Sequence, residues 1–412
     1  MLPRSLNILL FYPISAVKLT ERIELKKTQQ ISRLCHLAKN LYNLATFYMR
    51  QDFFYLDNWL KYHDLWHILK DTEAFRRLPS QSAQQVLKAV DRAWKSFFNS
   101  YKDWKCRPEK YFGRPNLPRY KKKNGEFVVI FTNQQCRIKN GSLHFPKKSG
   151  LAAIQTRINS GLHQARIVPK GLYYMLEIIY EKERTDLKLN KDRIIGIDLG
   201  LNNIVTIVNN AGLKPAIIKG GIVKSINQYY NKHLAKYISI KDKQGLKFET
   251  KHLQRLTRHR NNKINDFFHK SSRCIIKYCI EQKFGTIIIG FNKTWKQKVR
   301  LGKVNNQNFV QIPFQKLIQD IRYKAELVGI VVRLEPELFT SKCSFLDNEP
   351  IQRHERYMGR RISRGLFKTK NGLIINSDVN GAYNIIRKAV PNAIVADGIE
   401  GVGFHPYSIA IS

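Results

Sequence analysis

The chain has 412 residues, more than one hydrophobic core normally holds, so two or three domains are expected. It carries 72 Lys and Arg residues against 31 Asp and Glu, a formal charge of +41, which favours nucleic-acid partners over an anionic membrane. The six cysteines form no C-x-x-C pair, so a reducing intracellular compartment fits better than a disulfide scaffold. The apolar residues 6–17 are too few to span a bilayer and are interpreted as a first strand.

Two long helices are expected in the first hundred residues. After a strand-like run at 22–25, residues 29–50 place apolar side chains on one helical stripe. Pro79 and Ser80 then start a second helix, whose apolar and aromatic face includes Trp94 and Phe97. Such a face is packed into a core by default, so this part of the chain is predicted to be a helical lobe.

From Arg114 the pattern changes to short strands. Two prolines exclude regular helix between Arg114 and Arg119, and strand-like runs follow at 127–132, 136–138, 142–145, 164–168 and 173–180. Their spacing predicts a small antiparallel barrel or sandwich. Half-exposed strands often carry basic and aromatic residues, but the net charge favours nucleic-acid contacts here. The candidates are Arg114, Arg119, Tyr120, Lys121, Lys122 and Lys123.

The third region, from about residue 192, alternates strands and helices. Strands are expected at 194–197, 204–208 and 216–219, followed by a long helix whose start carries four cations, and later by strands at 286–289 and 330–334 with a helix at 314–327 between them. A last helix begins near Asp378. This order predicts an α/β domain with an RNase H-like fold. The four cations, also nucleic-acid candidates, are Arg255, Arg258, Arg260 and Lys263.

Two isolated acids stand at informative places in this basic chain. Asp198 ends the first buried strand, and Asp378 opens the last helix. Either acid alone would equally suit a turn or a helix cap. Two divalent ions held by several carboxylates can clamp the oxygens of a phosphodiester, and Mg2+ prefers oxygen ligands. The pair therefore predicts a metal site that faces a polyanion.

Four ordered motifs resemble those of one known family. They are GIDLG at 196–200, WKQ at 295–297, TSKCS at 340–344 and DVNGAYNI at 378–385. The chain resembles the TnpB family over nearly its whole length. These are transposon-encoded, RNA-guided DNA endonucleases related to type V CRISPR effectors.

The resemblance implies a domain plan. Residues 1–25 would form the first strands of a wedge β-barrel, 26–110 an inserted helical recognition domain, and 111–190 the rest of the barrel. Residues 191–412 would form a RuvC-like nuclease domain with a degenerate zinc-ribbon or lid segment at 340–375. The expected fold class is thus α/β for residues 191–412, with an all-α part at 26–110 and an all-β part in the barrel.

The resemblance also implies the partners. They would be a guide RNA from the transposon end and a double-stranded DNA target, read beside a short target-adjacent motif, with no membrane and no small-molecule substrate. A cytoplasmic, nucleoid-associated prokaryotic location follows. Further nucleic-acid candidates are Trp295, Lys296, Arg360, Arg361 and Arg364.

One departure from the family concerns catalysis. Gly290 stands where the family usually has a second catalytic Glu. We predict that Glu337 replaces it, because Glu337 follows a strand expected to lie about 4.8 Å from the one that lost its acid. Glu335 and Asp347 are weaker candidates, and a solvated loop acid is the alternative. The predicted catalytic and metal-binding set is Asp198, Glu337 and Asp378, with Mg2+ or Mn2+.

A second departure is the missing zinc ribbon. Between residues 340 and 378 only Cys343 remains of the expected cysteines, and His354 cannot complete a tetrahedral site, so no zinc is predicted.

Three functions stay open. The first is the RNA-guided endonuclease, the second a nuclease-inactive RNA-guided DNA-binding protein that acts as a repressor, and the third a transposase that joins strands itself.

Overall fold

The computed structural model describes residues 16–292, 310–363, 365–395 and 405–411, in a mixed α/β arrangement. The chain divides into two compact units. One runs from Lys18 to Lys182, and the other combines the residues from Glu183 onward with those before Lys18. The predicted contacts at Trp295, Lys296 and Arg364, and most of the predicted first strand, lie outside the described residues.

The first unit contains the two predicted long helices. They are α1 (Gln29–Tyr55) and α4 (Ser80–Cys106), whose apolar faces pack together in one core. The Thr28 hydroxyl caps α1 by accepting a hydrogen bond from the Ile31 amide. The aromatic stripe of α4 is a core feature, as predicted, since Trp94 is fully buried. Shorter helices follow at α2 (Tyr62–Leu69), α3 (Glu73–Arg76), η1 (Pro108–Lys110) and η2 (Lys147–Ser149).

The strands of this unit form two sheets. The larger has the order β1-β7-β6-β2, and the smaller has the order β3-β4-β5. The described pairings do not close either sheet into the predicted barrel, because β1 and β2 remain edges of the larger sheet. The bounds are β1 (Ala16–Lys26), β2 (Val129–Thr132), β3 (Arg137–Lys139), β4 (Ser142–His144), β5 (Ile154–Gln155), β6 (Leu162–Pro169) and β7 (Tyr173–Glu183).

The second unit is built on a six-stranded mixed sheet of order β12-β11-β8-β9-β10-β16. The strand β9 is antiparallel to both β8 and β10, whereas β11 is parallel to both β8 and β12. The five predicted strands are all present, and β16 adds a short edge strand. The bounds are β8 (Asn190–Asp198), β9 (Asn203–Asn209), β10 (Ala216–Lys219), β11 (Phe284–Gly290), β12 (Val331–Glu335) and β16 (Tyr407–Ser408).

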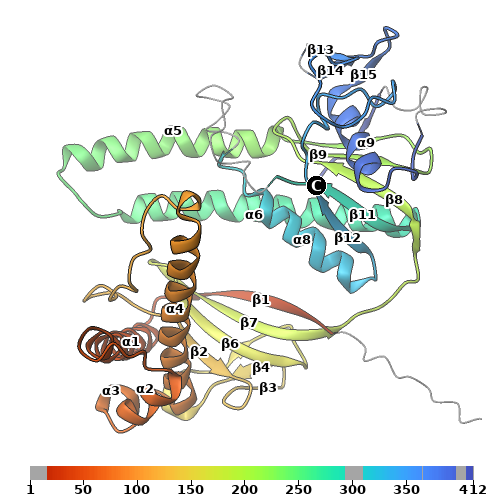
Figure 1. Cartoon of the computed structure of the whole chain (residues 1–412). Helices are drawn as coiled ribbons and strands as arrows, with labels where there is room; N and C mark the ends of the chain where they lie inside the picture. The colour runs from red at the N-terminus through yellow and green to blue at the C-terminus, as the bar shows by residue number, and fades with distance from the viewer. Residues whose placement is uncertain (1–15, 293–309, 364, 396–404, 412) are drawn as a thin grey trace, which may run out of the picture. The chain divides into compact units, whose positions relative to one another are not determined.

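Helices cover both faces of this sheet, because the central strands are apolar on both sides. Ile195 and Ile197 share a core with α6 (Lys251–Glu281) and α8 (Phe314–Leu327). The alternate residue Ile194 belongs to a separate core with α9 (Ser377–Ala389). The helix α5 (Gly221–Lys243) lies alongside α6, and the two form a hairpin (Figure 1).

The segment in which the resemblance would place a degenerate zinc ribbon or lid folds around a small sheet. Its strands are β13 (Arg360–Ser363), β14 (Leu366–Lys368) and β15 (Ile374–Asn376). Phe367 is buried in the core beneath α9, and Cys343 is buried with its thiol directed to the Gln352 carbonyl oxygen at 3.6 Å. None of the helices in the described part of the chain combines the length and the apolar composition needed to span a bilayer.

Candidate functional site

Three elements of the second unit bring acidic side chains to one end of the central sheet. Asp198 is the last residue of β8, and Glu337 follows the end of β12 by two residues. Both strands run parallel to β11, so their carboxyl ends share one edge of the sheet. The helix α9 crosses β8 so closely that a Cβ atom at Gly196 would lie 2.8 Å from the Ala382 carbonyl oxygen.

The start of α9 therefore faces the end of β8. A Cβ atom at Gly381 would lie 3.6 Å from Asp198 Oδ2. Gly381 follows Asp378 by three residues, so both occupy the same face of the helix. The two aspartates, 180 residues apart in the chain, come close enough for the Asp378 charge to act on Asp198.

The space above Gly290 is filled by the side chain of Glu337. A Cβ atom at Gly290 would overlap Glu337 Oε1 and would lie 2.8 Å from Glu337 Cγ. Glu337 Oε1 is buried, and the Glu337 carboxyl group hydrogen-bonds to Asp198. The Glu337 carboxylate thus occupies the position that a longer side chain at 290 would take.

The two weaker candidates are engaged elsewhere. Glu335 pairs in register with Gly290 but forms an ion pair with Lys388, with 3.9 Å between Oε1 and Nζ. Asp347 accepts a hydrogen bond of 2.9 Å from the Lys370 amide, in the turn between β14 and β15. Among the acids considered for the Gly290 gap, Glu337 is the one that the structure brings to Asp198.

The carboxylates are crowded, and this shows in the titration of Asp198. Burial and the neighbouring Asp378 charge raise the pKa of Asp198 well above its usual range. A hydrogen bond from the Leu199 amide, the Arg361 charge and the contact with Glu337 oppose this rise. A bound cation would favour the ionised form of all three acids.

Both oxygens of Asp378 are held by polar side chains. Asn203 donates a hydrogen bond of 2.8 Å from Nδ2 to Oδ2. Arg361 Nη2 lies 3.4 Å from Oδ1 and donates to Ser377 Oγ at 2.6 Å. Asn376 caps α9 through the Asp378 amide. Sequence reasoning missed Asn203, because nothing in the chain marks the first residue of β9 as a neighbour of α9.

The donor set fits a divalent metal. Three carboxylates from separate elements supply hard oxygen ligands, the type that Mg2+ and Mn2+ prefer. Their mutual repulsion at Asp198 is the kind that such an ion relieves. Within the described ranges, no group of three or more His, Cys, Asp and Glu side chains already has the geometry of a metal cage.

The predicted basic segment of the first unit lies along α1. Arg114, Arg119, Lys122 and Lys123 are exposed, as is Tyr120, whereas Lys121 is half-buried beside the Tyr42 ring at 4.5 Å. The segment is fastened to α1 about once per helical turn. The contacts are Phe127 amide to Cys35 oxygen (2.9 Å), Lys39 Nζ to Lys123 oxygen (2.7 Å), and Asn43 Nδ2 to Lys121 oxygen (3.0 Å).

The predicted cations of the second unit differ in their surroundings. Arg255, Lys263 and Arg360 are exposed, and Arg258 is half-buried. Arg260 is instead built into the α5–α6 hairpin, since it donates to Asn227 Oδ1 at 2.9 Å and to the Gln311 oxygen at 2.6 Å. Burial lowers its pKa. Arg260 thus uses these hydrogen-bond donors within the protein and not for a nucleic acid.

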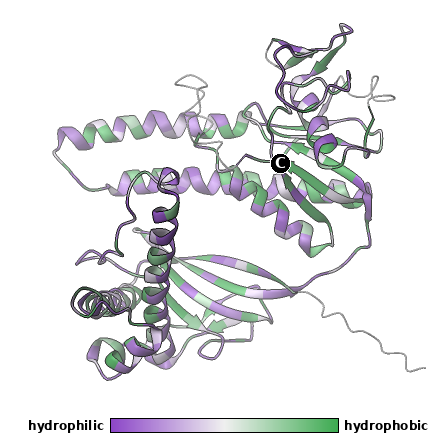
Figure 2. Cartoon of the chain, viewed as in Figure 1, coloured by the Kyte–Doolittle hydropathy of each residue, from purple (hydrophilic) through white to green (hydrophobic). Residues whose placement is uncertain are grey.

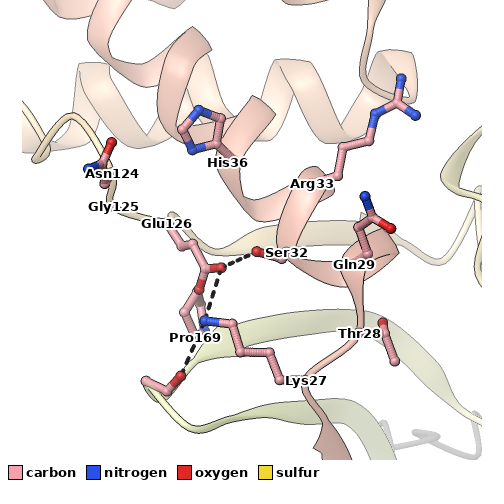
Figure 3. A pocket seen from close by; sticks show the side chains of 11 residues that line it. Lys27, Thr28, Gln29, Ser32, Arg33, His36, Asn124, Gly125, Glu126 and Pro169 are labelled. Carbon is pink, nitrogen blue, oxygen red and sulfur yellow. Dashed lines mark hydrogen bonds and ion pairs between the residues drawn. The ribbon is translucent and has the colours of Figure 1, made fainter. Parts of the chain in front are cut away.

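A cavity of about 820 Å³ in the first unit has a different character (Figure 3). Glu126 lies at its wall and accepts hydrogen bonds from the hydroxyls of Ser32 (2.7 Å) and Tyr174 (2.6 Å). Lys27 Nζ lies 3.7 Å from the same oxygen. Glu126 is the one acid in the lining of this cavity. The cavity therefore offers no cluster of carboxylates and is not a second candidate for a divalent-metal site.

Two family models match this chain. A model described as "Probable transposase" (OrfB_IS605) matches residues 177–296, and one described as "Cas12f1-like, TNB domain" matches residues 314–385. The first match contains Asp198 and Gly290, and the second contains Glu337 and Asp378.

Full-length relatives show the same similarity. The "TnpB-like protein ORF457" of Acidianus two-tailed virus is 23% identical and covers 88% of this chain and 84% of its own length. The "CRISPR-associated endodeoxyribonuclease Cas12f1" of Sulfoacidibacillus thermotolerans is 24% identical, covering 81% and 82% respectively. A solved Cas12f1–sgRNA–target DNA complex aligns over 89% of this chain and 98% of that chain at 15% identity, with a TM-score of 0.37.

Proposed function

The chain belongs to the TnpB family, and on that basis we propose that it is an RNA-guided DNA endonuclease with a metal-dependent, RuvC-like site. The relative named "CRISPR-associated endodeoxyribonuclease Cas12f1" supports the reaction class. The observation that carries the proposal is the Glu337 carboxylate above Gly290, in hydrogen-bond contact with Asp198. It supplies the acid that the sequence lacks at position 290.

In this proposal, Asp198, Glu337 and Asp378 hold Mg2+ or Mn2+ at the edge of the sheet. When bound, such ions stabilise the charge that develops on a scissile phosphate and promote attack by water. Asn203 and Arg361 position Asp378 by holding its two oxygens. The exposed side of the Arg361 guanidinium also offers a positive charge to the phosphate backbone.

Target selection would rest on a guide RNA that pairs with one DNA strand beside a short target-adjacent motif. The exposed cations of 114–123 would contact phosphates without reading sequence. Pairing would release the other DNA strand as a single strand, the form in which it reaches the carboxylates. A guide that derives from the transposon end is part of this proposal.

A nuclease-inactive, RNA-guided DNA-binding protein is the second candidate. It is favoured by Gly290, which places no side-chain carboxylate where the family usually has its second catalytic Glu. Both candidates predict tight, salt-sensitive binding, so affinity does not separate them. Metal-dependent cleavage does.

The test uses the protein purified with its co-purifying RNA, which is sequenced to define the target. We expect the complex to cut a matched plasmid in Mg2+, and Asp198→Ala to abolish cutting while target binding persists. Asp192→Ala, which removes an exposed acid from the same strand, is the matched control. Wild-type cutting by Asp198→Ala would disprove the site, and binding without any cutting by the wild type would favour the second candidate.

A further inference from the structure

The hairpin of α5 and α6 projects a largely solvated helix from the second unit (Figure 1). Of the 23 residues of α5, only Val223 and Asn227 are buried. Most of the hairpin is hydrophilic (Figure 2). The aromatic residues of α5 are therefore not explained by a hydrophobic core.

These aromatic residues form a ladder along one face of the hairpin. Tyr229, His233 and Tyr237 are spaced four residues apart, so they share a helix face. The ring centroids of Tyr229 and His233 are 4.2 Å apart, and those of His233 and Tyr237 are 6.3 Å apart. His252 of α6 stacks on Tyr237 at 5.6 Å with an interplanar angle of 17°. Tyr229, at the other end, is 58% exposed and presents a free ring surface.

A small cavity opens beside this exposed ring. It measures about 160 Å³, and Tyr229 and Tyr230 from α5 and His259 and Lys263 from α6 are in its lining. A cavity of about 150 Å³ is known to accept benzene, so this one has room for a six-membered ring. The wall is fixed, because Arg260 is anchored to Asn227 and stacks over Tyr230 at 5.3 Å.

The charge around the ladder suits a polyanion. Lys232 and Lys236 follow Tyr229 by three and seven residues, so they project from the same side of α5. Both are exposed. Asp242 is the single acid of the helix, against five lysines. Aromatic platforms flanked by cations are the recurring means of holding single-stranded nucleic acid without reading its sequence.

The N-terminal end of α5 is linked to the carboxylates by two hydrogen bonds. Lys224, in the first turn of α5, donates a hydrogen bond to Asn202, and the adjacent Asn203 holds Asp378. Tyr229 is five residues further along the helix, and Tyr237 lies roughly 12 Å beyond Tyr229 at 1.5 Å per residue. A strand laid along α5 would therefore lead toward the acidic site.

We propose that the ladder Tyr229–His233–Tyr237–His252 and the adjoining cavity bind the bases of single-stranded DNA, with a base stacked on Tyr229, and guide that strand to Asp198 and Asp378. The direction of the strand rests on the proposed nuclease function. The binding itself does not, because it needs only rings and cations that are present on the surface.

The test is fluorescence anisotropy of the RNA-bound protein in EDTA, with a labelled 20-nucleotide oligothymidylate as the probe. Tyr229→Ala and Tyr237→Ala should each weaken binding by roughly five- to a hundred-fold, the range for losing one stacked base. The salt slope should not change, since no cation is lost. By contrast, Lys232→Ala with Lys236→Ala should flatten the slope by about 0.7 per lost phosphate contact.

Two controls separate the possible outcomes. Tyr55→Ala removes a tyrosine that is 78% exposed in the other unit and should bind the probe like wild type. A DNA duplex, whose bases are already stacked, should bind equally to Tyr229→Ala and wild type. The proposal is overturned if Tyr229→Ala and Tyr237→Ala match Tyr55→Ala, or if they weaken duplex binding equally. If the wild type does not cleave DNA, the proposed nuclease function is wrong, but the difference in oligothymidylate binding between wild type and the tyrosine variants should remain.

Discussion

Gly290 and Glu337 illustrate how one residue can compensate for another across neighbouring strands. A glycine at the end of β11 removes a side chain and leaves a gap at the end of the sheet where Asp198 lies. Glu337, on the loop after the adjacent strand β12, has the length to fill it, and a Cβ atom at Gly290 would overlap its Oε1. This end of the sheet therefore still has a carboxylate at the gap, although that carboxylate comes from position 337 and not from position 290.

Glu337→Gln should lower the cleavage rate by about a hundred-fold or more, because an amide neither carries the charge nor binds a hard cation as a carboxylate does. Guided DNA binding should stay near wild type. The measurement is single-turnover cleavage of a matched duplex in Mg2+. Glu335→Gln is the matched control, since its ion pair with Lys388 lies outside the carboxylate cluster.

The same pair allows a stricter experiment. Gly290→Glu alone should impair cleavage, because the new side chain collides with Glu337 and with Ile385. Combining it with Glu337→Gly should recover part of the lost rate by returning the acid to β11. If the double variant is as inactive as Glu337→Gly alone, the two positions do not share one role.

At the scale of elements, the site depends on how closely α9 lies over β8. Gly196 permits this contact, since a Cβ atom there would lie 2.6 Å from Ile386 Cγ1 and 2.8 Å from the Ala382 oxygen. The second distance involves backbone, which cannot rotate away. The approach of α9 is what brings Asp378 to Asp198.

Gly196→Ala should therefore reduce the free energy of unfolding by about 1–3 kcal/mol, the usual cost of overpacking a core. Cleavage should fall as well, because α9 must shift and carry Asp378 with it. Chemical denaturation and the cleavage assay measure the two effects. Gly221→Ala, at a helical glycine with no atom within 4 Å of an added Cβ, should leave both near wild type or raise stability slightly.

At the scale of the whole molecule, the charge of +41 governs binding to nucleic acid. Each phosphate neutralised on duplex DNA contributes about −0.9 to the slope of log affinity against log salt. A complex with six to ten such contacts should lose about 10³- to 10⁵-fold in affinity between 50 and 200 mM salt.

Replacing both Lys122 and Lys123 with alanine should flatten that slope by up to about 1.8, since both side chains are exposed on the basic segment. The measurement is a salt titration of duplex binding by the RNA complex. Lys277→Ala should leave the slope unchanged, because this exposed lysine is ion-paired with Glu281. An equal effect of both changes would mean that the segment has no special role in binding.

Much of the architecture could be predicted from the sequence. The helix over 314–327 was expected at the bounds that α8 has, and the strands β8 to β12 of the second unit were expected near their observed positions in the sequence. These elements are local patterns of apolar residues, and a strand buried on both faces has an uninterrupted apolar run. The barrel expected in the first unit is not closed among the described strands. Barrel closure depends on pairing between strands that are far apart in the sequence, and local residue patterns do not specify such pairing.

By itself, the sequence determined the net charge of +41, the order of the elements and the positions of Asp198 and Asp378 at the end of a strand and the start of a helix, because charge, periodicity and motif are properties of the chain. Only the tertiary structure decided which acid fills the gap at Gly290, which residues hold Asp378 and that Arg260 is used within the hairpin. Those outcomes depend on distances between side chains that are far apart in the chain. The pairing of β12 with β11, the packing of α9 on the sheet and the packing of α5 on α6 set these distances.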